Sequence, residues 1–145
     1  MPLDPTRFLD AQNAVYPQVL SELRAGQKRT HWMWFVFPQL AGLGHSSTAQ
    51  FYALPNLASA QAYLAHPILG ARLRDCTRAV LLHRPDGPAP RTLEALFGYP
   101  DNLKFHSSMT LFHRAAPAEP LFATALDAFF AGAEDDATLA LLQSA

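Results

Sequence analysis

The sequence is poor in the residues that build disulfides, metal sites and strong electric fields. It contains a single cysteine, Cys76, which excludes an internal disulfide and any zinc site made of several thiolates. Its 11 basic and 12 acidic residues leave a net charge of −1, too little to attract nucleic acid or an anionic membrane to the whole protein. No apolar run approaches the roughly 20 residues that cross a bilayer, and the N-terminal MPLDPTRF lacks the apolar segment of a secretory signal. We therefore expect a cytoplasmic protein with neither a membrane nor a nucleic-acid partner.

The common catalytic and cofactor motifs are also missing. The 6 histidines show no HExxH spacing, and there is no G-x-S-x-G elbow, no G-x-G-x-x-G loop and no Walker loop. The sequence therefore predicts no bound metal and no cofactor.

Hydrophobic residues, in contrast, make up 50% of the 145 residues, enough for the core of one domain that covers residues 1–145. Short periodic segments follow one another, and most of them begin at a capping residue and end at glycine or proline. Pro17 predicts a kink or two short helices in the first of them. We expect an all-α fold, an irregular bundle of seven to nine short helices with room for one or two short strands. The expected N-caps are Asp4, Ser47, Asn56, Thr92, Asp101 and Asp135 or Asp136.

Residues 28–43 combine cations with aromatic rings. Lys28, Arg29 and His31 stand beside Trp32 and Trp34, the only tryptophans of the chain. The pattern is compatible with a short helix or a buried strand. An aromatic face beside cations suits a flat anionic ligand, whose ring would stack while its phosphate meets the cations. The alternative is a buried aromatic core with basic side chains turned to solvent.

A second polar segment follows at residues 101–112. On one helix Asp101, Lys104 and Ser108 would share a face, and Ser107 would lie next to Lys104, with apolar residues on the opposite side. A lysine and two serines near a helix start could hold a phosphate or a ribose hydroxyl. The alternative is a capped amphipathic helix with a solvated polar face.

Glu22 and Glu94, on otherwise apolar segments, are candidate catalytic carboxylates, and Asp10 and Asp101 come next. If a bond is cleaved, we expect Glu22 or Asp101 to act. Glu22 lies on an otherwise apolar segment and is close enough to Lys28 to form an ion pair across the Gly26 turn. A catalytic carboxylate needs a pKa raised by burial. The alternative is that each is a surface or ion-pair residue.

A family resemblance is carried by five segments: Leu23–Lys28, His31–Gln39, Tyr63–Gly70, Asp101–Lys104 and Ser107–Phe112. Together they resemble the bacterial family called domain of unknown function 1810 (DUF1810). The resemblance runs from about residue 4 to residue 142 and implies a compact, mainly helical cytoplasmic domain without an established activity.

A second, more distant resemblance lies in the order of four features: Phe37-Pro38, the alanine-rich residues 58–73, Lys104 with its following Met and Phe, and Thr138-Leu139. This order is similar to that of the NADAR superfamily, which includes YbiA-type enzymes that cleave N-glycosidic bonds. This resemblance implies a ribosyl-phosphate or ADP-ribose-like ligand and N-glycosidase chemistry. The rival hypothesis is a non-catalytic interaction or scaffold module.

Overall fold

The computed structural model describes residues 3–144, which form ten helices and no sheet. The all-α prediction is confirmed, but the helix count exceeds the predicted seven to nine because short helices of one or two turns leave little periodicity to detect. Within these residues no helix combines the length and the apolar content needed to span a bilayer. The helices are α1 (Thr6–Asn13), α2 (Tyr16–Ala25), α3 (Met33–Val36), α4 (Ser47–Tyr52), α5 (Leu57–Ala65), α6 (Pro67–Leu81), α7 (Leu93–Phe97), α8 (Asp101–Ala115), α9 (Pro120–Phe130) and α10 (Asp136–Ser144).

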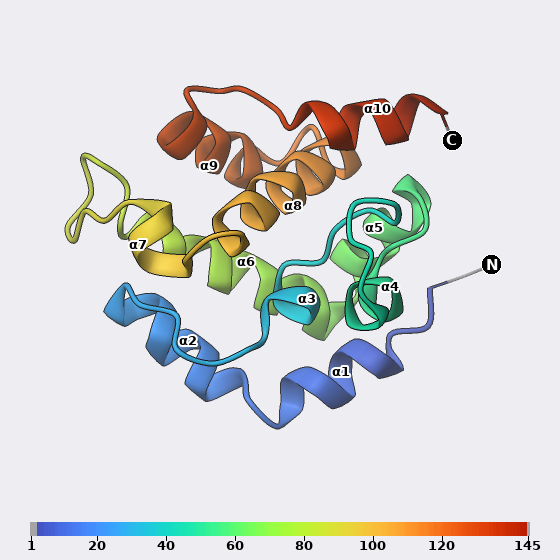
Figure 1. Cartoon of the computed structure of the whole chain (residues 1–145), viewed down its shortest axis with the longest axis horizontal. Coiled ribbons are helices and arrows are strands. Elements are labelled where there is room, and N and C mark those ends of the chain that lie inside the picture. The colour runs from blue at the N-terminus through green and yellow to red at the C-terminus, as the bar shows by residue number, and fades with distance from the viewer. Residues whose placement is uncertain (1–2, 145) are drawn as a thin grey trace.

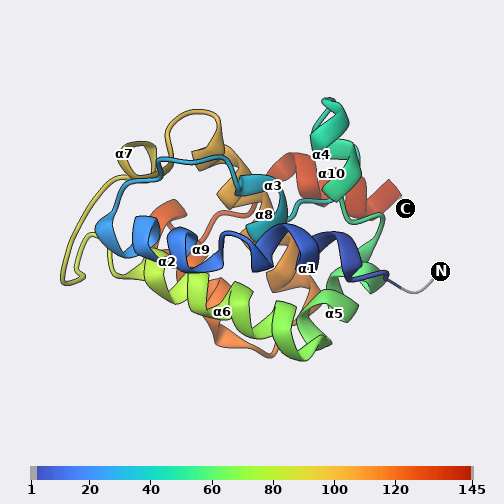
Figure 2. The same cartoon turned by 90° about the horizontal axis from the view of Figure 1, so that it is seen from below.

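Helix α8 runs through the middle of the molecule (Figure 1). It packs against α5, α7, α9 and α10, and α6 packs against α2, α5 and α9. Helices α1 and α2 lie along the edge opposite α9 and α10 in Figure 1, and they face the viewer in Figure 2. An element surrounded in this way buries most of its sides, and every residue of α8 from 107 to 112 is buried.

Three of the six predicted N-caps are confirmed by their capping hydrogen bonds. Asn56 Oδ1 accepts from the backbone N–H of Ser59, and Thr92 Oγ1 accepts from that of Ala95. Asp135 Oδ2 likewise accepts from the N–H of Thr138. Such caps satisfy backbone donors that have no partner inside the helix. These residue types therefore predict helix starts from the sequence.

Three predicted caps are wrong. Helix α4 is capped by Ser46, whose Oγ accepts from the N–H of Ala49. Asp4 Oδ1 does bind the N–H of Thr6, but the residue at the α1 N-cap position is Pro5. Asp101 is the first residue of α8 and makes no capping hydrogen bond. Its carboxylate instead forms ion pairs with Lys28 and Lys104.

The core beneath residues 28–43 is aromatic. The ring of Phe105 lies 5.1 Å from that of Phe37 and 5.2 Å from that of Phe97, and Trp32 lies 6.3 Å from Phe37. Offset and edge-on pairs at these distances add to the stabilisation from burial itself. Residues 28–43 are therefore partly core, which was one of the two interpretations of their sequence.

Cys76, the lone cysteine, is fully buried on α6. Burial raises the pKa of its thiol to about 12, so the group stays protonated at neutral pH. This agrees with an inert core residue.

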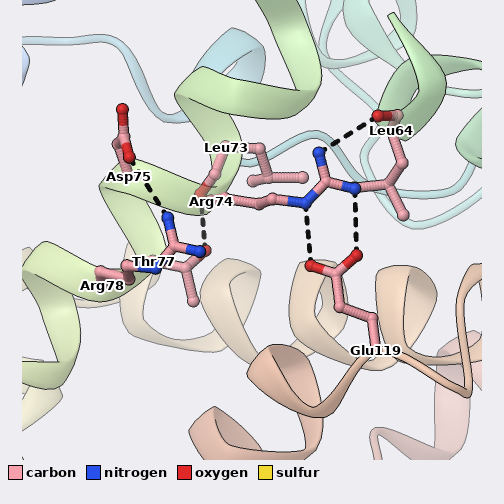
Figure 3. Close-up of polar contacts among 7 residues, drawn as sticks. All are labelled: Leu64, Leu73, Arg74, Asp75, Thr77, Arg78 and Glu119. Carbon is pink, nitrogen blue, oxygen red and sulfur yellow. Dashed lines mark hydrogen bonds and ion pairs between the residues drawn. The ribbon is translucent and has the colours of Figure 1, made fainter. Parts of the chain in front are cut away.

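An ion pair joins α6 to the start of α9 (Figure 3). Arg74 Nε and Nη2 donate to the two carboxylate oxygens of Glu119 at 2.8 and 3.0 Å, and Nη1 donates to the carbonyl oxygen of Leu64 at 3.3 Å. This bidentate geometry fixes the orientation of the guanidinium relative to the carboxylate as well as the distance between them. One guanidinium thus connects α5, α6 and the residue that precedes α9.

Candidate functional site

The site begins at the turn that ends α2. Gly26 has a φ of +80°, a conformation that glycine adopts without steric cost, and a Cβ at this position would overlap the side chain of Arg91. After the turn, the N–H of Lys28 donates to the carbonyl oxygen of Leu96 at 2.7 Å. This bond holds residue 28 against α7, beside the first turn of α8.

Glu22 receives the returning chain with both of its carboxylate oxygens. Oε1 accepts from the N–H groups of Arg29 and Thr30 and from the indole N–H of Trp32, at 2.7 to 3.0 Å. Oε2 accepts from the hydroxyl of Thr30 and the amide of Gln18. Burial by itself raises the pKa of Glu22, but these donors outweigh it and hold the pKa at about 2. The group is therefore an ionised anchor for the turn, with its acceptor positions filled.

The predicted ion pair between Glu22 and Lys28 is not formed. Lys28 Nζ lies 3.0 Å from Asp101 Oδ2 instead, and Lys104 Nζ lies 3.2 Å from the other oxygen, Oδ1. Glu22 is occupied by donors from residues 29–32, so Lys28 pairs with the carboxylate at the start of α8. Two lysines from distant parts of the chain thus share one carboxylate.

Each of these lysines also faces a tryptophan. Lys28 Nζ lies 5.2 Å from the ring centroid of Trp32, and Lys104 Nζ lies 5.2 Å from that of Trp34. Both distances are within the range of cation–π attraction. Trp32 is buried, whereas Trp34 is partly exposed and lines a hollow. Of the two tryptophans, only Trp34 is therefore placed to contact a ligand.

Lys28 and Asp101 line a hollow of about 340 Å³, within the range of small-molecule pockets. We call it the Lys28–Asp101 hollow. Arg29 and His31 lie at its exposed rim, and Lys104 adjoins it through Asp101 and Trp34. Its lining is Lys28, Arg29, His31, Met33, Trp34, Phe97, Tyr99, Pro100 and Asp101.

Sequence reasoning missed two aromatic residues of this lining, Phe97 and Tyr99. Tyr99 is 76% exposed, in the turn between α7 and α8. An exposed aromatic residue between Gly98 and Pro100, where no helix can continue, was the available signal.

Four predicted residues lie elsewhere. Glu22 and Trp32 are buried behind the hollow, bound to each other. Ser107 Oγ donates to Asp135 Oδ2 at 3.1 Å, toward α10. Ser108 is fully buried, and its hydroxyl has no hydrogen-bond partner among the described residues. The predicted polar face of α8 is therefore wrong beyond its first turn, because neighbouring helices enclose the remainder.

The described part of the chain holds no group of three or more histidine, cysteine, aspartate or glutamate side chains placed to share a metal ion. What the hollow offers is cationic, aromatic and hydrogen-bonding side chains around one carboxylate. Such a set can bind an anion and stack a ring, and its carboxylate can stabilise positive charge.

Comparison with known proteins places the chain in a family. Residues 2–142 match the family model described as "Protein of unknown function (DUF1810)". The chain is similar to the crystal structure of the conserved hypothetical protein Rv1873 from Mycobacterium tuberculosis, with 51% identity and a TM-score of 0.88 over 97% of this chain and 99% of that one. No curated protein matches significantly, and the comparisons give the likeness to the NADAR superfamily no support. The chain belongs to the DUF1810 family.

Proposed function

We propose that the Lys28–Asp101 hollow binds a small anionic ligand with a flat ring, of the ribosyl-phosphate or nucleotide class. One observation carries the proposal: Lys28 and Lys104 converge on Asp101 beside the partly exposed Trp34. Phosphate would bind the lysines, and the ring would stack on Trp34 or on Tyr99.

The charges at the hollow favour an anion. Lys28 and Lys104 pair with Asp101, the single carboxylate of the lining, and Arg29 adds a third cation at the rim. Three cations beside one carboxylate leave an excess of positive charge, and a phosphate that takes the two ammonium groups over from Asp101 would neutralise it. His31 and Tyr99 supply polar groups at the opening for ribose hydroxyls.

If the protein also cleaves an N-glycosidic bond, Asp101 is the group in position to act. Its ionised carboxylate would stabilise the positive charge that develops on the ribosyl ring and orient a water molecule. Glu22 is a poor second candidate, because its oxygens are occupied by its own chain and its low pKa makes it a weak base.

Calorimetry tests the binding proposal. Wild-type protein is titrated with ADP-ribose, AMP and ribose 5-phosphate, beside Lys104→Gln and the control Arg78→Gln, which removes an exposed cation on α6. We expect saturable binding, about tenfold weaker in Lys104→Gln because one phosphate contact is lost, and unchanged in Arg78→Gln. The absence of binding to all three compounds would exclude this ligand class.

Chromatography then separates catalysis from binding alone. Incubation of the protein with AMP and NAD should release free base or nicotinamide if the hollow hydrolyses N-glycosidic bonds, and Asp101→Asn should abolish the release. Binding without release would identify a non-catalytic ligand-binding module, the nearest form of the rival hypothesis.

A further inference from the structure

A second and larger hollow lies on the other side of α7 and the first turn of α8. It has a volume of about 650 Å³ and is lined by residues 85, 90–93, 102–103 and 128–130. We call it the apolar groove. The loop after α6, the start of α7 and the end of α9 form its other walls, and these segments lie at one end of the molecule (Figure 1).

The apolar groove is separate from the Lys28–Asp101 hollow. On α8, Asp101 lines the hollow, whereas the next residues, Asn102 and Leu103, line the groove. On α7, Phe97 faces the hollow and Leu93 faces the groove. Successive residues of a helix point about 100° apart, so the first turn of α8 can serve two cavities, whereas Leu93 and Phe97 are separated along the axis of α7.

The walls of the groove leave apolar surface open to solvent. Leu103 is 51% exposed, and Phe129 and Phe130 are partly exposed. The ring of Phe130 stacks on His106 at a centroid distance of 3.8 Å, and His106 Nε2 lies 2.8 Å from the carbonyl oxygen of Ala133. This wall is therefore held in place before any ligand arrives, and covering it would release water from apolar surface.

Arg91 is the single charged residue of the lining. Its guanidinium forms no ion pair and no hydrogen bond with the described residues, although its side chain is held beside Gly26 and its backbone N–H bonds to His83. Arg91 is exposed and lines a groove whose other walls are mainly apolar, and an unpaired guanidinium at such a groove complements a carboxylate that ends an apolar chain.

Asn102 adds an adaptable polar group. Its Oδ1 is buried without a hydrogen-bond partner among the described residues. Rotating the amide by 180° therefore sacrifices no hydrogen bond of the oxygen, and either its carbonyl or its NH2 group can be turned to a ligand.

We propose that the apolar groove binds a small apolar carboxylate, with its hydrocarbon chain against Leu103, Phe129 and Phe130 and its carboxylate on Arg91. The apolar walls would supply the affinity, and Arg91 would distinguish the acid from a neutral molecule of the same length. This site does not depend on the function proposed for the other hollow.

A series of ligands tests both parts. Hexanoate, octanoate and decanoate are titrated against the full chain, with 1-octanol as the uncharged partner of octanoate, and binding is followed by calorimetry. We expect affinity to rise about five- to tenfold for each two methylene groups, and octanoate to bind about tenfold more tightly than 1-octanol. Affinities that do not change with chain length would overturn the apolar part of the proposal, and equal affinities for acid and alcohol would overturn the charged part.

Variants locate the binding. Arg91→Gln should weaken octanoate binding about tenfold without changing 1-octanol binding, and Leu103→Ser should weaken both; each changed side chain is largely exposed, so the fold should persist, as circular dichroism can verify. Lys104→Gln, on the other hollow, should change neither. Binding that is lost in Lys104→Gln but kept in Arg91→Gln, or no saturable binding by the wild type, would contradict the site.

Discussion

Glu22 and Asp101 are two carboxylates with opposite surroundings. Glu22 is 3% exposed and is surrounded by donors from its own chain, including backbone N–H groups and the indole of Trp32. Asp101 is bound by the ammonium groups of two lysine side chains and borders a hollow. The first arrangement completes a turn and leaves no position for a ligand. The second leaves charges that a ligand can rearrange.

The difference shows how a carboxylate with a structural role can be told from one that can bind a ligand or take part in a reaction. Backbone and indole donors cannot leave without unfolding the segment that carries them, whereas lysine side chains can turn to a new partner at little cost. We therefore expect changes at Glu22 to alter stability, and changes at Asp101 to alter binding. The four predictions below test that distinction, in order of decreasing effect on the free energy of unfolding.

Replacing Glu22 by alanine should have the largest effect. Five donor contacts would lose their acceptor, two of them backbone N–H groups, and we expect a loss of about 3–5 kcal/mol in the free energy of unfolding. Urea unfolding followed by tryptophan fluorescence measures it. The control is Glu94→Ala, an exposed carboxylate on α7, with an expected change below about 0.5 kcal/mol. A change below about 1 kcal/mol in Glu22→Ala would show that the turn does not depend on this group.

Acid should remove the contribution of Glu22 without a mutation. Its pKa is lowered from 4.5 to about 2 by folding, so its stabilisation is complete above pH 4.5 and is lost as the pH falls toward 2. The loss should be about 3 kcal/mol. Urea midpoints are measured from pH 7 to pH 2 for the wild type and for Glu22→Gln. The difference between the two curves isolates the contribution of Glu22, because the other carboxylates titrate in both proteins. Parallel pH curves for the two proteins would contradict the assignment.

Glu119→Gln should have an intermediate effect. It breaks the two-pronged pair with Arg74, whose members are each roughly a quarter exposed, and we expect a loss of about 2 kcal/mol in thermal or urea unfolding. The matched control is Asp75→Asn, which breaks the exposed pair with Arg78 that is also drawn in Figure 3. That pair is more than half exposed on both sides and should contribute less than about 0.5 kcal/mol. Equal losses in the two variants would mean that geometry and burial do not set the strength of these pairs.

Asp101→Asn should have the smallest effect on stability, about 1 kcal/mol, and the most specific effect on the site. The asparagine oxygen can still accept from one lysine, and Lys104 can turn to solvent. Two lysines that no longer share a carboxylate should bind the phosphate of ADP-ribose about three- to tenfold more tightly, while any N-glycosidic cleavage falls. Calorimetry and chromatography on one sample measure both. Weaker ADP-ribose binding in this variant would show that Asp101 contacts the ligand in place of restraining the lysines.

Much of the fold follows from local signals in the sequence. Asn56, Thr92 and Asp135 bind the backbone within three residues of themselves, so the sequence predicts their caps without any knowledge of packing. The composition, and the proline and glycine residues that end the short periodic segments, likewise predict an all-α chain.

The site could be predicted only in part, because its details depend on contacts between distant segments. Residues 28–34 and the start of α8 were both recognisable as mixtures of cations and apolar groups. The partner of Lys28 was not, since two carboxylates of the same charge were available and only the folded turn decides between them. Ser108 was misplaced for the same reason: four helices pack around α8, and a helical pattern does not reveal how many sides are covered.

The reactivity of the Cys76 thiol can report how often the core of the protein is transiently exposed. The thiol is fully buried and protonated at neutral pH, and no second cysteine in the sequence competes for a reagent. Modification of the native protein by a thiol reagent therefore requires α6 to separate from its neighbours. The rate of that modification, without any introduced label, would measure how often the centre of this protein is exposed to water.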